Sequence, residues 1–313
     1  MYLTSINYYL LSKNSRRIIM SGKKTRVVVI ALALLAIVVG CVVGSSKADT
    51  KGVSGTVNAA GSSALLPLVQ SAAKSFMDEN PDSVINTNGG GSGQGLQQVS
   101  DGTIDIGDSD LFAEEKLDKK SASKLVDHQV AITAIAPIVN KDAGVKSLTT
   151  QQLIDVYTGK VTNWNQVGGN DCKIVLISRP ASSGTRATFE QYALNKTASR
   201  SNQSLETDDS GTLIQMIQSV EGAVGYVALS YLTGNPDVTA VAINGVKPTL
   251  ANVYNGSYKV WNYEHMYTKG QPKKTAVKAF LKKMLSKEYE SKVEGMGYGV
   301  ASKLSDKAKK EHK

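Results

Sequence analysis

The feature that most constrains the fold of this chain is a regular alternation of short apolar, β-branched runs with segments of helical periodicity. Residues 56–60 are predicted to form a strand and residues 63–80 a helix, because apolar side chains recur in the second segment at helical spacing. Such alternation predicts an α/β fold with largely parallel sheets. Further strands are predicted at 83–86, 104–107, 130–139, 173–178 and 225–229, and further helices at 95–100, 149–158, 185–194, 213–220 and 275–294.

The first 40 residues have the pattern of an export signal. Lys23, Lys24 and Arg26 precede an uncharged, largely aliphatic run at 27–40, and a basic segment followed by such a run is typical of a secretory signal. Met20 is an alternative start of this segment, since residues 1–19 add nothing to the pattern.

The apolar run ends on Gly40-Cys41, which resembles a bacterial lipobox. Cys41 is therefore expected to become the acylated first residue of the mature protein, and the small polar residues at 41–54 to form a flexible tether. The alternative is an uncleaved transmembrane anchor over 27–44, which is just long enough to span a bilayer. Both readings place the folded part outside the membrane.

The net charge of +9 belongs mainly to this front segment. Residues 1–40 hold six basic residues and no acidic one, so 30 basic and 27 acidic residues follow, a net charge of +3. No stripe of basic and aromatic residues is present, which argues against nucleic-acid binding. The cysteines, Cys41 and Cys172, and the three histidines have no metal-ligand spacing, so neither a metal nor a cofactor is expected.

Three segments place hydroxyls and glycines where a predicted strand runs into a predicted helix. They lie at 58–64, 89–95 and 178–185. The first N–H groups of a helix lack an intrahelical partner and carry the positive end of the helix dipole, and glycine lets a ligand approach the backbone closely. One such segment is an ordinary helix cap, but three of them at the carboxyl ends of strands predict an anion site.

Asp110 follows the predicted strand at 104–107 and makes the anion site more specific. Phosphate carries a proton at neutral pH and sulfate does not. A buried carboxylate accepts that proton in a charge-assisted hydrogen bond and repels an anion that has none. Asp105 and Asp108 are the local alternatives for this role, and a turn cap is the structural alternative.

At this point the sequence resembles the phosphate-binding proteins of bacterial phosphate ABC importers, the PstS family. The resemblance covers about residues 56–300 and depends on five motifs taken together. They are Gly-Ser-Ser-Ala at 61–64, Gly-Ser-Gly-Gln-Gly at 91–95, Ile-Asp-Ile-Gly-Asp-Ser-Asp at 104–110, Ser-Arg-Pro-Ala-Ser-Ser-Gly-Thr-Arg at 178–186 and Gly-Ala-Val-Gly-Tyr-Val at 222–227.

The resemblance implies a two-lobed periplasmic-binding-protein type II fold, in which two crossover strands form a hinge. Lobe I is expected at 55–135 and 265–313 and lobe II at 136–264, with the crossovers near 130–139 and 259–268. Carried over by motif, the phosphate ligands are Ser63, Ala64 (through its N–H), Ser92, Asp110, Arg179, Ser183, Gly184 (through its N–H) and Thr185.

Two departures from the family pattern concern the cleft. Members often have Thr-Phe where this chain has Ser63-Ala64, and they commonly have an aspartate near the arginine, where this chain has Ala181. The first change is expected to loosen the cleft wall. The second implies that Arg179 is held differently.

The resemblance further implies a monomeric, lipid-anchored receptor on the outer face of a Gram-positive cell membrane, which delivers phosphate to permease and ATPase subunits. A receptor for another oxyanion or small acidic ligand, and a lipoprotein that has lost the ligand, are alternatives. A secreted hydrolase is a third, but the Ser-x-x-Lys matches at 71–74 and 121–124 lack their companion motifs and no Gly-x-Ser-x-Gly occurs.

Overall fold

The computed structural model describes residues 52–201, 205–233, 238–310 and 312. The signal at 1–40, Cys41 and most of the tether at 41–54 lie outside the described residues. Within the described part of the chain, no helix combines the length and apolar character needed to span a bilayer.

The strands form one main sheet in the order β2-β1-β3-β10-β4-β7-β6, with β8 also paired to β4, and a small parallel sheet of β5 and β9. The two outer parts of the sheet are parallel, as predicted: β1 pairs in parallel with β2 and with β3, and β6 pairs in parallel with β7. The strands are β1 (Gly55–Gly61), β2 (Ser83–Asn88), β3 (Ile106–Ser109), β4 (Leu125–Asn140), β5 (Ser147–Leu148), β6 (Val175–Leu176), β7 (Ala223–Ala228), β8 (Val238–Ala240), β9 (Ala242–Ile243) and β10 (Trp261–Lys269).

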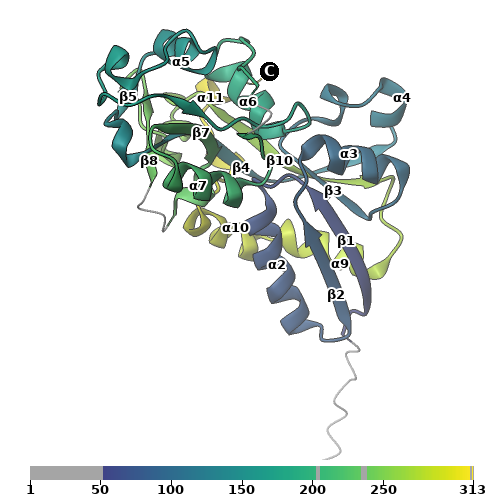
Figure 1. Ribbon diagram of the computed structural model, residues 1–313. Helices are drawn as coiled ribbons and strands as arrows, with labels where there is room; N and C mark the ends of the chain where they lie inside the picture. The colour runs from purple at the N-terminus through teal and green to yellow at the C-terminus, as the bar shows by residue number, and fades with distance from the viewer. Residues whose placement is uncertain (1–51, 202–204, 234–237, 311, 313) are drawn as a thin grey trace, which may run out of the picture. The chain divides into compact units, whose positions relative to one another are not determined.

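The centre of the sheet differs from the prediction. β10 is antiparallel to both of its neighbours, β3 and β4, because the chain leaves one lobe along β4 and returns along β10. Figure 1 shows β4 and β10 between the group of β1, β2 and β3 and the group that contains β7 and α5. These two strands are the expected crossovers, and they give the two-lobed α/β architecture that the family resemblance implied.

The predicted helices are found close to their predicted positions, except at 275–294, and the short helices α4, α8 and α11 were not predicted. The segment 275–294 forms two helices, α9 and α10, because Ser286 accepts a hydrogen bond from the amide of Tyr289 (3.2 Å) and starts a new helix. The helices are α2 (Leu66–Glu79), α3 (Ser92–Asp101), α4 (Lys119–Ala122), α5 (Thr150–Tyr157), α6 (Gly184–Tyr192), α7 (Ser210–Ser219), α8 (Leu250–Tyr254), α9 (Thr275–Met284), α10 (Lys287–Val293) and α11 (Asp306–Lys310).

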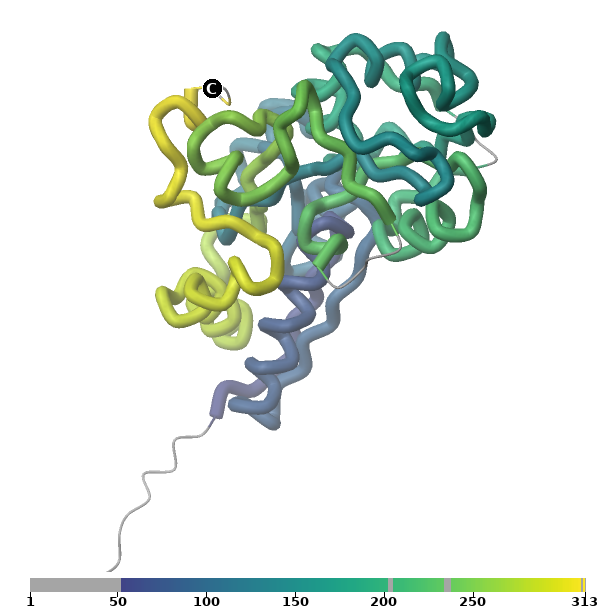
Figure 2. Tube along the Cα trace, turned by 90° about the vertical axis from the view of Figure 1, so that its left-hand side faces the viewer, coloured from purple at the N-terminus to yellow at the C-terminus, as the bar shows by residue number. Residues whose placement is uncertain are grey.

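Two large apolar clusters stabilise the two halves. One packs β1 against α2 and α9, where the rings of Phe76 and Phe280 meet edge to face at 5.6 Å. The other surrounds Trp164 and Trp261 and includes Leu304 and Ala308 of the C-terminal segment. Figure 2 shows this segment, in yellow, beside the green chain of α8. The predicted lobe boundaries stay a prediction. Leu304 and Ala308, which were assigned to lobe I, pack in the same cluster as Trp164, which was assigned to lobe II.

Candidate functional site

The three hydroxyl-bearing segments of the sequence meet at one place, between the ends of β1 and β3 and the starts of α3 and α6. Ser63, Ser92 and Thr185 are all buried there, at 1–3% exposure. Two further segments join them: Asp110, which directly follows β3, and the start of α7, with Ser210 and the preceding Asp208. We call this group the cradle: Ser62, Ser63, Ala64, Ser92, Asp110, Ser183, Gly184, Thr185, Asp208 and Ser210.

Asp110 lies at the centre of the cradle and links the two lobes. One carboxylate oxygen accepts a hydrogen bond from the hydroxyl of Ser62, and the other accepts one from Thr185 Oγ1 at 2.8 Å. The amide of Asp110 donates to Ser92 Oγ at 3.0 Å, which leaves the Ser92 hydroxyl hydrogen free to donate elsewhere. Burial raises the pKa of Asp110, and the hydrogen bonds from Ser62 and Thr185 oppose this rise.

The turn that leads into α2 supplies Ser63 and Ala64. Leu65 donates its amide to Ser62 Oγ at 3.1 Å, so Ser62 caps this turn. The amides of Ser63 and Ala64 lie within the same turn, where helical N–H groups have no partner of their own. Ser63 Oγ reaches across the cleft, donating to the carbonyl of Asp208 at 2.6 Å and lying 3.1 Å from Ser210 Oγ.

The start of α6 supplies Ser183, Gly184 and Thr185. Ser183 caps the helix by accepting from the amide of Arg186 at 3.4 Å. Glycine is required at position 184 because Ser92 and Asp110 lie close to its Cα. A methyl group at this position would clash with Ser92 Oγ and come within 2.8 Å of Ser92 Cβ and 2.9 Å of Asp110 Cβ. The first turn of α6 therefore touches the opposite lobe through glycine.

Arg179 was expected as a phosphate ligand, but its guanidinium is bonded to the protein. Its side chain is fully buried, and its donors engage protein acceptors. Nη1 donates to the carbonyl of Asp208 (3.0 Å), Nη2 donates to Ser210 Oγ (2.9 Å), and Nε and Nη2 donate to the carbonyl of Tyr226 (3.3 and 3.2 Å). The guanidinium thus holds Asp208 and Ser210 of the cradle in place through hydrogen bonds and adds positive charge to the site.

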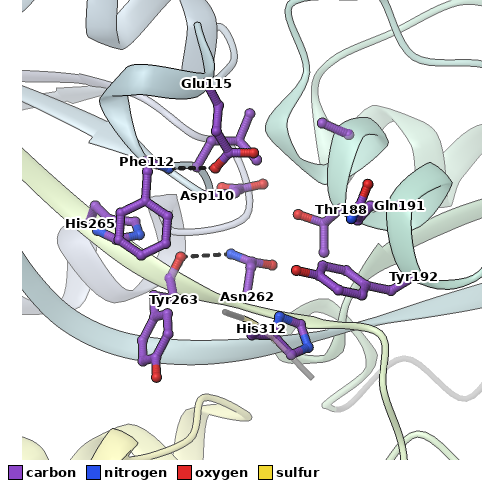
Figure 3. A pocket seen from close by; sticks show the side chains of 12 residues that line it. Asp110, Phe112, Glu115, Thr188, Gln191, Tyr192, Asn262, Tyr263, His265 and His312 are labelled. Atoms are coloured by element: carbon purple, nitrogen blue, oxygen red, sulfur yellow. Dashed lines mark hydrogen bonds between the residues drawn. The ribbon is translucent and has the colours of Figure 1, made fainter. Parts of the chain in front are cut away.

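A cavity of about 360 Å³ adjoins the cradle at Asp110, a size at the lower end of the range for small-ligand sites. Figure 3 shows Thr188 and Gln191 of α6 on one side, Phe112 and Glu115 on the other, and Asn262 of β10 between them. Because both lobes and a crossover strand line this cavity, it gives the cradle an open approach along the lobe boundary.

Among the residues that the structure describes, no group of three or more His, Cys, Asp or Glu is arranged to hold a metal ion. His265 instead lies against Asp127, with its Nδ1 at 2.9 and 3.0 Å from the two carboxylate oxygens. His128 lies 3.1 Å from the hydroxyl of Thr268. Both histidines belong to the crossover strands.

Residues 46–288 match a family model described as a PBP superfamily domain. The phosphate-binding protein PstS of Bacillus subtilis is 47% identical over 249 residues, which cover 80% of this chain and 81% of that protein. The chain belongs to the PstS family. PstS of Pseudomonas aeruginosa is 28% identical over 287 residues, covering 83% of this chain and 88% of that protein.

A solved PstS-like structure shares this fold. It is a phosphate ABC transporter substrate-binding protein with bound phosphate from Clostridium perfringens, with a TM-score of 0.69 and 34% identity. The similarity covers 78% of this chain and 98% of that protein. A phosphate transport receptor from Vibrio cholerae, at 24% identity and a TM-score of 0.61, shares the fold.

Sequence reasoning missed the partner of Arg179 in this PstS-family chain. The expected aspartate is absent at Ala181, but the carboxylate of Asp208 lies 3.5 Å from Arg179 Nη1. A signal for it was present, since Asp208 and Asp209 directly precede a helix that starts with Ser210-Gly211-Thr212. This is a fourth hydroxyl-rich helix start, and it resembles the three that were recognised.

Proposed function

We propose that this chain captures inorganic phosphate in the cradle between its lobes. The observation that carries the proposal is the position of Asp110, a buried carboxylate whose two oxygens accept hydrogen bonds from one hydroxyl of each lobe. A carboxylate in this position accepts the proton of a phosphate ion. It repels sulfate, which has no proton to donate.

The proposed ligands are those expected from the sequence except Arg179, for which we propose a different role. Hydroxyls of Ser63, Ser92, Ser183 and Thr185 and the amides of Ala64 and Gly184 would donate to the phosphate oxygens, and Asp110 would accept. The bonds that Asp110 and Ser63 now make across the cleft join the two lobes, and phosphate would replace them. Arg179 would act through its charge and by positioning Ser210, because its donors already engage protein acceptors.

The family similarity supports a role in transport. We propose that the chain delivers phosphate to the permease and ATPase subunits of an ABC importer, as a monomer and without turnover of the ligand. Cys41 would carry a lipid anchor that holds the protein on the outer face of a Gram-positive cell membrane. Labelling of cells with a radioactive fatty acid, with Cys41→Ala as the control, tests the anchor.

Isothermal titration calorimetry with phosphate, sulfate and molybdate tests the ligand. Protein freed of phosphate by unfolding and refolding should bind phosphate at one site per chain, and sulfate far more weakly. Tighter binding of sulfate than of phosphate would contradict the proposal. Sustained release of phosphate from a chromogenic ester would show an enzyme instead.

A further inference from the structure

Glu264 of β10 lies next to Asp110, just beyond the end of β3. The antiparallel pairing of β10 with β3 ends at His265 opposite Ser109, so Glu264 and Asp110 are the next residues of the two chains. Their carboxyl groups are close enough to interact. A second carboxyl group therefore lies beside the one that the cradle uses.

Asp108 adds a third carboxyl group. It lies two residues before Asp110 and therefore points to the same face of the sheet. Asp108 and Glu264 are both fully buried. Among the residues that the structure describes, none of their four carboxyl oxygens has a partner with hydrogen-bond geometry, although the Glu264 carboxyl lies close to the side chains of Asn262 and Asp110. Both oxygens of Asp110, in contrast, accept hydroxyl protons.

An ionised carboxylate without a partner is so costly to bury that the group takes up a proton instead. Burial, and then the negative charge of Asp110, raises the pKa of both Asp108 and Glu264 well above the ordinary range of carboxyl groups. Burial raises the pKa of Asp110 too, but less strongly, because the hydrogen bonds from Ser62 and Thr185 and the positive charge of Arg179 oppose the rise.

The other titratable groups around these carboxyls do not supply a counter-charge. Asp208 adds negative charge beside Asp110, and the Arg179 guanidinium is shared between Asp110 and Asp208. Two buried phenols are also coupled to these carboxyls, Tyr231 to Asp110 and Tyr298 to Glu264, and burial raises the pKa of each phenol, to about 12 for Tyr231. Both phenols are neutral over the pH range in which a carboxyl titrates.

We propose that Asp108 and Glu264 hold protons in the working receptor, so that Asp110 is the single ionised carboxyl of this group. The inference rests on the proposed phosphate site. The two acids are positioning residues: they leave Asp110 as the acceptor for the phosphate proton and add no negative charge of their own beside the anion. Loss of either proton at alkaline pH would place that charge next to the bound phosphate and weaken binding.

The direction of the pH effect follows from linkage. Bound phosphate adds negative charge, so the two acids hold their protons more tightly in the complex than in the free protein. Affinity is therefore full below the pH at which the free protein loses these protons. Above that pH it falls, by up to about tenfold per pH unit for each proton linked to binding.

Calorimetry with inorganic phosphate tests the proposal over the alkaline range in which the ligand remains the monohydrogen dianion. The wild-type affinity should decline with pH, and the decline should be smaller in Asp108→Asn and Glu264→Gln, whose neutral amides have no proton to lose. Asp105→Asn is the matched control, because Asp105 is an acid of the same segment that pairs with Lys274 at 2.7 Å. It should keep the wild-type slope.

Equal slopes in the wild type and in both variants would overturn the inference while leaving phosphate binding intact. Failure of the wild type to bind phosphate at neutral pH would instead overturn the proposed function. If neither variant folds, calorimetric titrations of the wild type with phosphate in buffers of different ionisation enthalpy measure the number of protons taken up on binding. Proton uptake on binding at alkaline pH supports the inference, and no uptake overturns it.

Discussion

Closure of the two lobes over the ligand depends on the missing side chain of Gly184. The backbone of Gly184 is not in the positive-φ region, so alanine fits its conformation. The added methyl group, however, would clash with Ser92 Oγ and lie 2.9 Å from Asp110 Cβ, and both of these atoms belong to the opposite side of the cleft. Gly184→Ala should therefore disfavour the closed form without disturbing α6.

The expected loss follows from the cost of overpacking. Forcing a methyl group into a close contact costs about 1–3 kcal/mol. At roughly 1.4 kcal/mol per factor of ten, this raises the Kd for phosphate by about 5- to 150-fold. The free energy of unfolding should not fall, because the clash is relieved when the lobes open and alanine favours the helix more than glycine does.

Calorimetry with phosphate measures the loss, and small-angle X-ray scattering with and without phosphate measures closure. Gly295→Ala is the matched control, because Gly295 has no heavy atom within 4 Å of an added methyl group and no positive φ. It should bind phosphate like the wild type. A Gly184→Ala variant that binds within twofold of the wild type and compacts to the same degree would refute this reasoning.

Three further substitutions test other parts of the site. Asp110→Asn should weaken phosphate binding by roughly ten- to a hundredfold, since it removes a charge-assisted hydrogen bond of about 1.5–3 kcal/mol, and should improve sulfate binding; a parallel loss for both anions in calorimetry would contradict it. Asp208→Asn leaves the buried Arg179 without its nearest carboxylate and should lower the free energy of unfolding by about 2 kcal/mol in urea titrations, whereas an unchanged midpoint would show that the carbonyls suffice. Tyr298→Phe removes the 2.6 Å hydrogen bond from the phenol to the buried carbonyl of Ala64 and should cost about 1–2 kcal/mol in the same assay; no change would mean that the carbonyl finds another donor.

The sequence predicted the local structure well because the signals are local. Apolar periodicity predicted the strands and helices around the site, and hydroxyls at helix starts predicted where an anion could bind. The prediction of a single helix at 275–294 was wrong because the apolar stripe continues through Ser286, while the cap at that residue breaks the helix.

What the sequence determined by itself is the set of short-range features: the alternation of strands and helices, the serine- and glycine-rich helix starts, and Asp110 at the end of a strand. Only the tertiary structure decided how these are combined. It paired Arg179 with Asp208 and brought Glu264 of β10 beside β3. The physical reason is that burial and charge interactions depend on distance in space, and residues more than 150 positions apart, such as Asp110 and Glu264, give no joint signal in the chain.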